Sequence, residues 1–281
     1  MSNNDNLQEK IDKMREKYRL EREKRLRSDG SDQFVQVKGE FSYFSEDPYS
    51  NDVLEREPRE EITDIVIVGG GFGGLLAAAR LSAIGYSDIT VVEEGADFGG
   101  TWYWNRYPGA QCDVESYVYM PLLEEVGSMP SEKYAYGNEI FEHSRSIGKH
   151  FGLYDKALFQ TRMIDAKWNE DSTTWKVLTN RGDSLHAKFL VLATGNLTKP
   201  KLPGIPGIEK FNGHMFHTSR WDYGYTGSNG RNDLSALRDK QVAIIGSGAT
   251  AVQVVPNLAA SVQKLYVCQR TPSTVDIRGN G

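Results

Sequence analysis

The stretch ITDIVIVGGGFGG, residues 62–74, decides the fold of this chain. A run of apolar residues ends in glycines, which is typical of a buried strand that passes into a tight turn. Residues 73–85 are then predicted to form a helix, and DITVVEE at 88–94 a second strand. Because a strand, a helix and a strand in this order form a βαβ unit, the segment predicts a parallel sheet in an α/β fold.

The glycines of this stretch follow the pattern G-x-G-x-x-G. Gly69 permits the tight turn, Gly71 lets the backbone approach a pyrophosphate, and Gly74 lets the helix pack close to the strand. The N-terminus of the helix at 73–85 faces the phosphates, and Phe72 just before it is a further predicted cofactor contact. Since strand, turn, helix and second strand come in the required order, we predict a dinucleotide site here.

A second, similar arrangement lies near the end of the chain. A strand starting at Gln241 runs into GSGATA, residues 246–251, which gives G-x-G-x-x-A. A helix to about Ala260 and the strand KLYVCQR follow. The predicted contacts with a second dinucleotide come from Gly246, Gly248, Ala249, Thr250 and Ala251.

The two arrangements differ in the charge that follows the second strand. Glu93 stands at that place in the first, and Arg270 at the same spacing in the second. A carboxylate there accepts hydrogen bonds from ribose hydroxyls, whereas a guanidinium binds a 2′-phosphate. We therefore predict FAD in the first site and NADPH in the second, with Thr271 sharing the phosphate. The alternative is that Glu93 and Arg270 only cap their strands.

Composition restricts the class of protein further. The chain has 281 residues, 39% of them hydrophobic, and a net charge of −5, so a nucleic-acid partner is disfavoured. Cys112 and Cys268 form no CxxC pair and no metal-ligand spacing, which suits a reducing compartment. No apolar run is long enough to span a bilayer, and the N-terminus is not signal-like, so a cytoplasmic location is expected. Composition leaves the oligomeric state open.

The other segments are predicted from their periodicity and turn residues. Residues 5–27 carry Leu7, Ile11, Met14 and Tyr18 at helical spacing, so we predict a solvated helix lying on the body of the protein, with a partner-binding helix as the alternative. Further predictions are an extended lead-in at 28–60, an ordered loop at 97–130, a helix at 137–151, an antiparallel meander from 158 ending in a buried strand at 189–193, a proline-marked linker from 200, and a flexible loop at 223–233.

Two longer strings carry a resemblance to a known family. FNGHMFHTSRWD, residues 211–222, fits F-x-G-x-x-x-H-x-x-x-W-[P/D], and GTWYWNRYPGAQCD, residues 100–113, fits G-x-W-x-x-x-x-[FY]-P-G-x-x-x-D. Between and beside two dinucleotide turns, these strings resemble those of Type I Baeyer–Villiger monooxygenases, from about Ile62 to the last residue. The resemblance implies two Rossmann-like domains, FAD-binding and then NADP-binding.

The resemblance also implies roles for individual residues. Trp102 and Tyr119 lie beside the flavin with Gly100 and Thr101, and Asp113 lies near its reactive edge, where it positions an arginine. Thr194 and Gly195 form a turn under the flavin nucleotide. A conformational role is implied for His217, which ties the linker to the nicotinamide domain. Asp113 could instead be a loop acid, Trp102 plain core, and zinc binding by His214 and His217 is disfavoured by the spacing.

The implied activity is oxygen insertion next to a ketone carbonyl, giving an ester or lactone. NADPH reduces FAD, and a flavin peroxide formed with O2 attacks the ketone. Two alternatives remain: an N- or S-oxygenating flavin monooxygenase, and an inactive remnant that keeps a nucleotide-binding fold. The chain resembles an N-terminal fragment that is inactive by itself, without the peroxide-supporting arginine and most of the substrate pocket. The expected divisions are an extension at 1–60, the FAD domain at 61–199, a linker at 200–222 and a partial NADP domain at 223–281.

Overall fold

A six-stranded mixed sheet forms the centre of the molecule. The structure is a computed structural model that describes residues 3–50, 52–227, 233–277 and 279–280. The strand order is β4-β3-β2-β7-β6-β5. The strands are β2 (Glu60–Val68), β3 (Ile89–Val92), β4 (Ala157–Leu158), β5 (Met163–Asn169), β6 (Thr174–Thr179) and β7 (Ser184–Leu192). β2, β3, β4 and β7 run parallel, while β5, β6 and β7 form the predicted antiparallel meander. The predicted α/β fold is confirmed.

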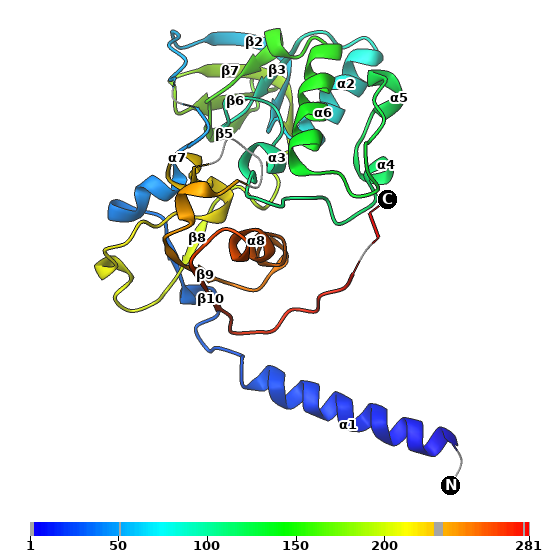
Figure 1. Cartoon of the computed structure of the whole chain (residues 1–281). Helices are drawn as coiled ribbons and strands as arrows, with labels where there is room; N and C mark the ends of the chain where they lie inside the picture. The colour runs from blue at the N-terminus through cyan, green and yellow to red at the C-terminus, as the bar shows by residue number, and fades with distance from the viewer. Residues whose placement is uncertain (1–2, 51, 228–232, 278, 281) are drawn as a thin grey trace.

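Strand β2 is central because apolar side chains cover both of its faces. Ile65 and Ile67 pack on one side with the helices α2 (Phe72–Ala83) and α6 (Gly137–His150), and Val66 and Val68 pack on the other. Figure 1 shows the two helices together beside the sheet. The carboxyl end of β2 is thereby fixed in the core, directly before the first glycine turn.

The meander ends differently from the prediction. β7 begins at Ser184 and ends at Leu192, so it is longer than the predicted strand. Phe189 and Leu192 were expected to be buried, but they are 58% and 63% exposed. The prediction is wrong for these two side chains because no element in the described part of the chain covers them.

The predicted loop at 97–130 contains three short helices. They are α3 (Thr101–Trp104), α4 (Ser116–Tyr119) and α5 (Leu123–Val126). Outside this loop, a 3-10 helix, η3 (Tyr154–Lys156), directly precedes β4. Trp102, Tyr103 and Trp104 of α3 are all buried. Their apolar surface anchors a glycine-rich segment that lacks the periodicity of a longer helix.

A smaller α/β unit follows the linker. β9 (Gln241–Ile245) and β10 (Lys264–Cys268) form a two-stranded parallel sheet, with α8 (Ala249–Ala259) between them in the chain. Its core includes Trp221 from the string at 211–222, together with Leu234, Val254 and Leu258. The predicted strand–helix–strand order is confirmed. Short elements precede it: η4 (Ile208–Lys210), η5 (Thr218–Arg220), α7 (Tyr223–Thr226) and η6 (Ser235–Leu237). Helix α7 replaces the first part of the loop predicted at 223–233, and residues 228–232 of that loop lie outside the described residues.

The segment before β2 contacts the rest of the chain more closely than the predicted lead-in. It forms η1 (Gly30–Gln33), β1 (Phe34–Gln36) and η2 (Gly39–Ser45), and β1 pairs with β8 (Lys201–Pro203) inside the predicted linker. The Tyr49 hydroxyl donates to the Trp104 carbonyl at 3.2 Å and accepts from the Trp221 N–H at 3.0 Å. These contacts join three segments that are distant in sequence.

A buried ion pair fixes the end of this segment. Arg56 binds both carboxylate oxygens of Asp183, at 2.6 and 2.7 Å, and Asp183 is fully buried. The Thr179 hydroxyl and the Arg59 N–H donate to the same carboxylate. Burial opposes the ionisation of Asp183, but these hydrogen bonds outweigh it and hold its pKa well below its usual range.

Replacing Arg56 with lysine is expected to lower the free energy of unfolding by about 1–2 kcal/mol at pH 7, because lysine cannot make the two-point contact. The pKa of Asp183 is depressed only in the folded state, so the unfolded chain binds more protons in acid. The stabilisation is full above the unfolded pKa of about 4 and is lost as pH falls further. Chemical denaturation at several pH values measures the difference. Arg59→Lys is the control, since the Arg59 side chain is about half exposed; an equal loss in both variants would contradict the assignment.

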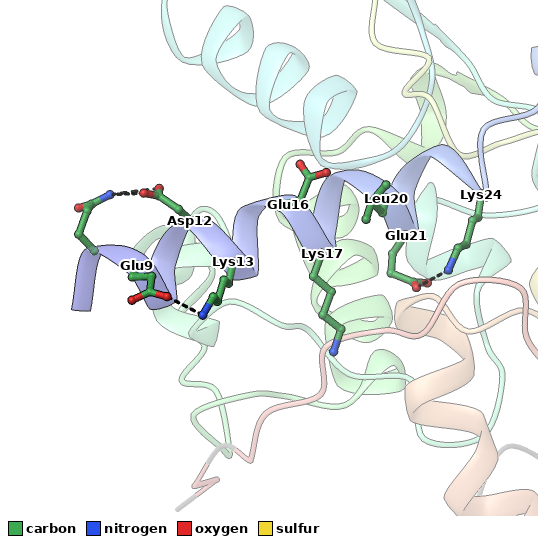
Figure 2. Close-up of a pocket in the computed structure, with 9 residues that line it drawn as sticks. Glu9, Asp12, Lys13, Glu16, Lys17, Leu20, Glu21 and Lys24 are labelled. Atoms are coloured by element: carbon green, nitrogen blue, oxygen red, sulfur yellow. Dashed lines mark hydrogen bonds and ion pairs between the residues drawn. The ribbon is translucent and has the colours of Figure 1, made fainter. Parts of the chain in front are cut away.

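Helix α1 (Asn3–Glu23) is solvated as predicted, but it projects from the body of the protein (Figure 1). Charged side chains surround its narrow apolar stripe, and Leu7, Met14 and Tyr18 are exposed. Ion pairs support it, including Lys13–Glu9 within the helix and Lys24–Glu21 at its end (Figure 2). The residues drawn in Figure 2 line a groove formed by α1 and Lys24 alone, so it is a surface groove and not a candidate ligand site.

Candidate functional site

The first glycine turn lies at the carboxyl end of β2, against two other loops. Gly69 has a φ of +109°, and a side chain there would meet the Ala193 carbonyl, directly before Thr194 and Gly195. A Cβ on Gly100 would lie 2.7 Å from the Cα of Gly71, so these two backbones touch. The first turn, the turn at 194–195 and the start of the string at 100–113 therefore meet, as the sequence predicted for one site.

This turn suits a pyrophosphate in two respects. Gly71 is the N-cap of α2 and provides no side-chain cap for the first N–H groups of the helix. Those groups have no partner within the helix and are free to bind an anion. Gly74 packs so closely on the Gly69 carbonyl that a Cβ would lie 1.8 Å from its oxygen. The close packing fixes the direction in which the start of the helix points.

Glu93 stands directly after β3, and its carboxylate turns back to the glycine turn. Its two oxygens accept the N–H of Gly70 and, at 2.6 Å, the N–H of Gly95, and its side chain is buried. Burial raises the pKa of Glu93, while these two backbone N–H groups oppose the rise. The Glu93 carboxylate thus stabilises the first glycine turn through the N–H of Gly70. Each oxygen keeps a lone pair, which is the acceptor chemistry that ribose hydroxyls require.

Aromatic side chains line the adjacent region. The Trp102 indole N–H donates to the Tyr119 hydroxyl at 2.9 Å, and the Phe72 and Tyr119 ring centroids are 5.8 Å apart. Burial raises the pKa of Tyr119, so the hydroxyl stays protonated at neutral pH. Trp102 and Tyr119, the two residues that the resemblance places beside a flavin, are therefore brought together with Phe72, next to Gly71 and Gly100.

Asp113 is exposed on the loop that follows, and Thr101 is exposed at the start of α3. The charge of Asp113 acts on Tyr107 and Tyr119, whose pKa values are raised mainly by burial and further by this carboxylate. Asp113 thus lies near the aromatic group and also near the loop that contacts α8.

The second glycine turn lies between β9 and α8. Gly246 has a φ of +122°, and a Cβ on Gly246 or Gly248 would meet open space. Gly248 is the N-cap of α8 without a side-chain cap, and Ala251 packs in the core below it. The Ser247 hydroxyl donates to the Thr271 carbonyl, which ties the turn to the end of β10. The open backbone before Ala249 and Thr250 suits a second pyrophosphate.

Arg270 is exposed at the end of β10, next to that turn. Its guanidinium donates to the side-chain oxygen of Gln33 in the N-terminal segment. An amide oxygen binds a guanidinium more weakly than a phosphate does, so an incoming phosphate can replace it. The N-terminal segment therefore reaches the second site, which the sequence did not predict.

The string at 211–222 has a local structural role. His217 Nδ1 accepts from the Ser219 N–H at 3.2 Å and caps η5, so the predicted bond to the nicotinamide domain is not found among its contacts. Burial and the charge of Arg220 lower the pKa of His217. His214 pairs with Asp222 at 2.8 Å, and the described residues contain no group of three or more potential metal ligands. Trp221 packs in the core of the smaller unit, and Asp222 caps α7.

Sequence reasoning missed two residues that connect the parts of the site. Arg220 is buried, stacks on Trp104 with 3.7 Å from Cζ to the ring centroid, and donates to the Thr198 carbonyl at 3.2 Å. Gln253 of α8 contacts Tyr107 and Gln111. No spacing rule marks either residue. Arg220 lies inside the string at 211–222, and the two partners of Gln253 lie inside the string at 100–113. Membership in these strings is the only sequence signal that points to the two residues.

Comparison with known proteins agrees with this geometry. A family model described as pyridine nucleotide-disulphide oxidoreductase matches residues 63–277. The chain therefore belongs to this family. Its two cysteines, Cys112 (buried) and Cys268 (exposed), are both free and form no disulfide with each other.

Its relatives include neopentalenolactone D synthase of Streptomyces avermitilis, 53% identical over 271 residues, which are 96% of this chain and 46% of the relative. A Baeyer–Villiger monooxygenase of Streptomyces coelicolor is 50% identical over 267 residues, 95% of this chain and 44% of the relative. The chain thus spans less than half the length of these relatives.

Solved structures give the same result. The polycyclic ketone monooxygenase of Thermothelomyces thermophila matches with a TM-score of 0.93 and 43% identity, over 97% of this chain and 46% of that one. Cyclohexanone monooxygenase of Rhodococcus sp. Phi1 bound to NADP+ matches with a TM-score of 0.70 and 34% identity, over 79% of this chain and 40% of that one. Among the described helices, none is long and apolar enough to cross a membrane.

Proposed function

We propose that this chain provides the FAD and NADPH sites of a Baeyer–Villiger monooxygenase. The observation that supports this most strongly is a pair of glycine turns on one chain, each of which starts a helix without a side-chain cap. The sequence that carries them is 50% identical to a Baeyer–Villiger monooxygenase. The domain divisions proposed are 61–199 for FAD and 223–281 for NADP, joined by 200–222. The N-terminal 60 residues are an extension that contacts both domains.

The proposed roles follow from the chemistry of each side chain. Gly69, Gly71 and the start of α2 bind the FAD pyrophosphate, and Glu93 accepts ribose hydroxyls. Trp102 and Tyr119 exclude water beside the isoalloxazine, and Asp113 orients a cation there. Gly246, Gly248 and the start of α8 bind NADP(H), with Arg270 on its 2′-phosphate. When bound, FAD and NADPH supply the hydride and oxygen chemistry that no side chain can supply.

A ketone is the proposed substrate, with O2 as co-substrate. Supporting this, the related enzymes are named for polycyclic ketone and cyclohexanone oxidation. His217 has a structural role in this proposal, since its Nδ1 is occupied by Ser219. The two free cysteines support a reducing, cytoplasmic location.

Product analysis tests the proposal. The protein that carries this chain is loaded with FAD and given NADPH, O2 and either a cyclic ketone or a thioether. We expect a lactone from the ketone, detected by gas chromatography with mass spectrometry. The rate of NADPH oxidation should rise with the concentration of the ketone. Sulfoxide without lactone would instead support an S-oxygenating enzyme. A purified protein that retains no flavin would contradict the FAD assignment.

A further inference from the structure

Residues 107–111, from the second half of the string at 100–113, contact helix α8. Their partner is Gln253, one and a half turns after the second glycine turn. Its Nε2 donates to the Gln111 carbonyl at 2.9 Å, and its Oε1 accepts the Tyr107 hydroxyl at 2.9 Å and, more weakly, the Gln111 N–H at 3.4 Å. The Gln253 amide thus binds Gln111 through both its donor and its acceptor.

The backbone between these two residues is shaped for close approach. Gly109 has a φ of +80°, and a Cβ there would lie 2.6 Å from the Gln253 carbonyl oxygen and 2.3 Å from Nδ2 of Asn257. Asn257 in turn donates to the Gln253 carbonyl at 2.9 Å. Only glycine lets the loop approach α8 so closely. Together, Tyr107, Gly109, Gln111, Gln253 and Asn257 form a contact that we call the loop–helix dock.

The dock lies between the two candidate nucleotide sites. On one side, the loop begins with Gly100 and Trp102, which touch the first turn and its aromatic group. On the other side, Gln253 belongs to the helix that Gly248 starts. A helix held at its second turn has a fixed N-terminus, so the dock sets the position of the second turn relative to the first.

We infer that the loop–helix dock couples the two nucleotide sites, with Gln253 as a positioning residue that makes NADP(H) bind more tightly when FAD is present. This inference rests on the proposed function. FAD orders the loop at 100–113, the ordered loop holds α8 through Gln253, and the second turn then meets its ligand without further ordering. By linkage, NADP(H) strengthens FAD binding by the same factor.

Calorimetric titration measures this coupling. NADP+ is titrated into the protein with and without FAD, for the natural sequence and for Gln253→Leu. We expect FAD to increase NADP+ affinity in the natural protein by about 10-fold, within the usual range of coupling, and by less than about 2-fold in Gln253→Leu. NADP+ affinity without FAD should be similar in both. Tyr107→Phe, which loses one of the bonds, should give an intermediate value.

Gln263→Ala is the matched control, since Gln263 is exposed just after α8. It should keep the full coupling. Hydrogen exchange gives a second measurement: the amides of residues 107–112 should exchange faster in Gln253→Leu than in the natural protein or the control. If both proteins bind both nucleotides and FAD increases NADP+ affinity by the same factor in Gln253→Leu as in the natural protein, the inference is wrong and the proposed function still stands. A protein that binds neither nucleotide would overturn the proposed function and this inference with it.

Discussion

Alanine in place of Gly74 is expected to destroy the first glycine turn. The new Cβ would lie 1.8 Å from the carbonyl oxygen of Gly69, which is backbone and cannot rotate away. Either α2 must move off β2 or the turn must open, and both expose the core around Ile67 and Leu75. We expect a loss of more than about 4 kcal/mol in the free energy of unfolding, in the range of severe core disruption. Thermal and chemical denaturation measure it.

Gly73 provides a matched control for this prediction. A Cβ on Gly73 would lie 3.6 Å from the Cβ of Ala193, an ordinary van der Waals contact. Because alanine is favoured over glycine within a helix, Gly73→Ala should leave the stability unchanged or raise it by up to about 1 kcal/mol. If the two alanine variants were equally stable, the close packing of Gly74 on Gly69 would be wrong.

Glutamate in place of Arg270 should remove the preference for a phosphorylated nucleotide. Arg270 is exposed beside the second turn and makes a side-chain contact only to a neutral amide, Gln33, among the bonds described. Two charge-assisted hydrogen bonds to a 2′-phosphate contribute about 1.5–3 kcal/mol each, and a carboxylate would repel that phosphate. We therefore expect the ratio of NADP+ to NAD+ affinity to fall by at least about 100-fold.

The measurement for Arg270→Glu is titration of NADP+ and NAD+ into the same preparation. NAD+ affinity should change little, since the variant keeps both glycines of the turn. Lys264→Glu at the other end of β10 makes the same change of charge and should keep the natural preference. A preference for NADP+ that survives Arg270→Glu would show that another cation recognises the phosphate.

Much of the site could be predicted because its pattern is local. Gly69, Gly71 and Gly74 lie within six residues of one another, and each has a separate steric reason to be glycine. The regular length of a βαβ unit gives the positions at which Glu93 and Arg270 were found, and their opposite charges are read directly from the sequence. The same regularity predicted β2, α2, β3, β9, α8 and β10, whose existence and order the structure confirms.

The remaining features depend on contacts between distant residues. The side chain of Gln253 meets Tyr107 and Gln111 across more than one hundred residues, and no period of the sequence marks that meeting. Strand β1 is too short for its alternation to be distinguished from an irregular segment. The hydrogen bonds that Glu93 accepts from Gly95 and that His217 accepts from Ser219 likewise depend on which backbone N–H lies nearby in the folded chain.

The pairing of β1 with β8 has a consequence for folding during synthesis. Phe34–Gln36 leaves the ribosome first, but Lys201–Pro203 emerges only after roughly 160 further residues, on the order of ten to thirty seconds later at ordinary rates of translation. During that interval the N-terminal strand has unsatisfied backbone groups. The six-stranded sheet is itself complete only once β7 (Ser184–Leu192) has been made, just before β8. The beginning of the chain is therefore among its last parts to be fixed in the native structure.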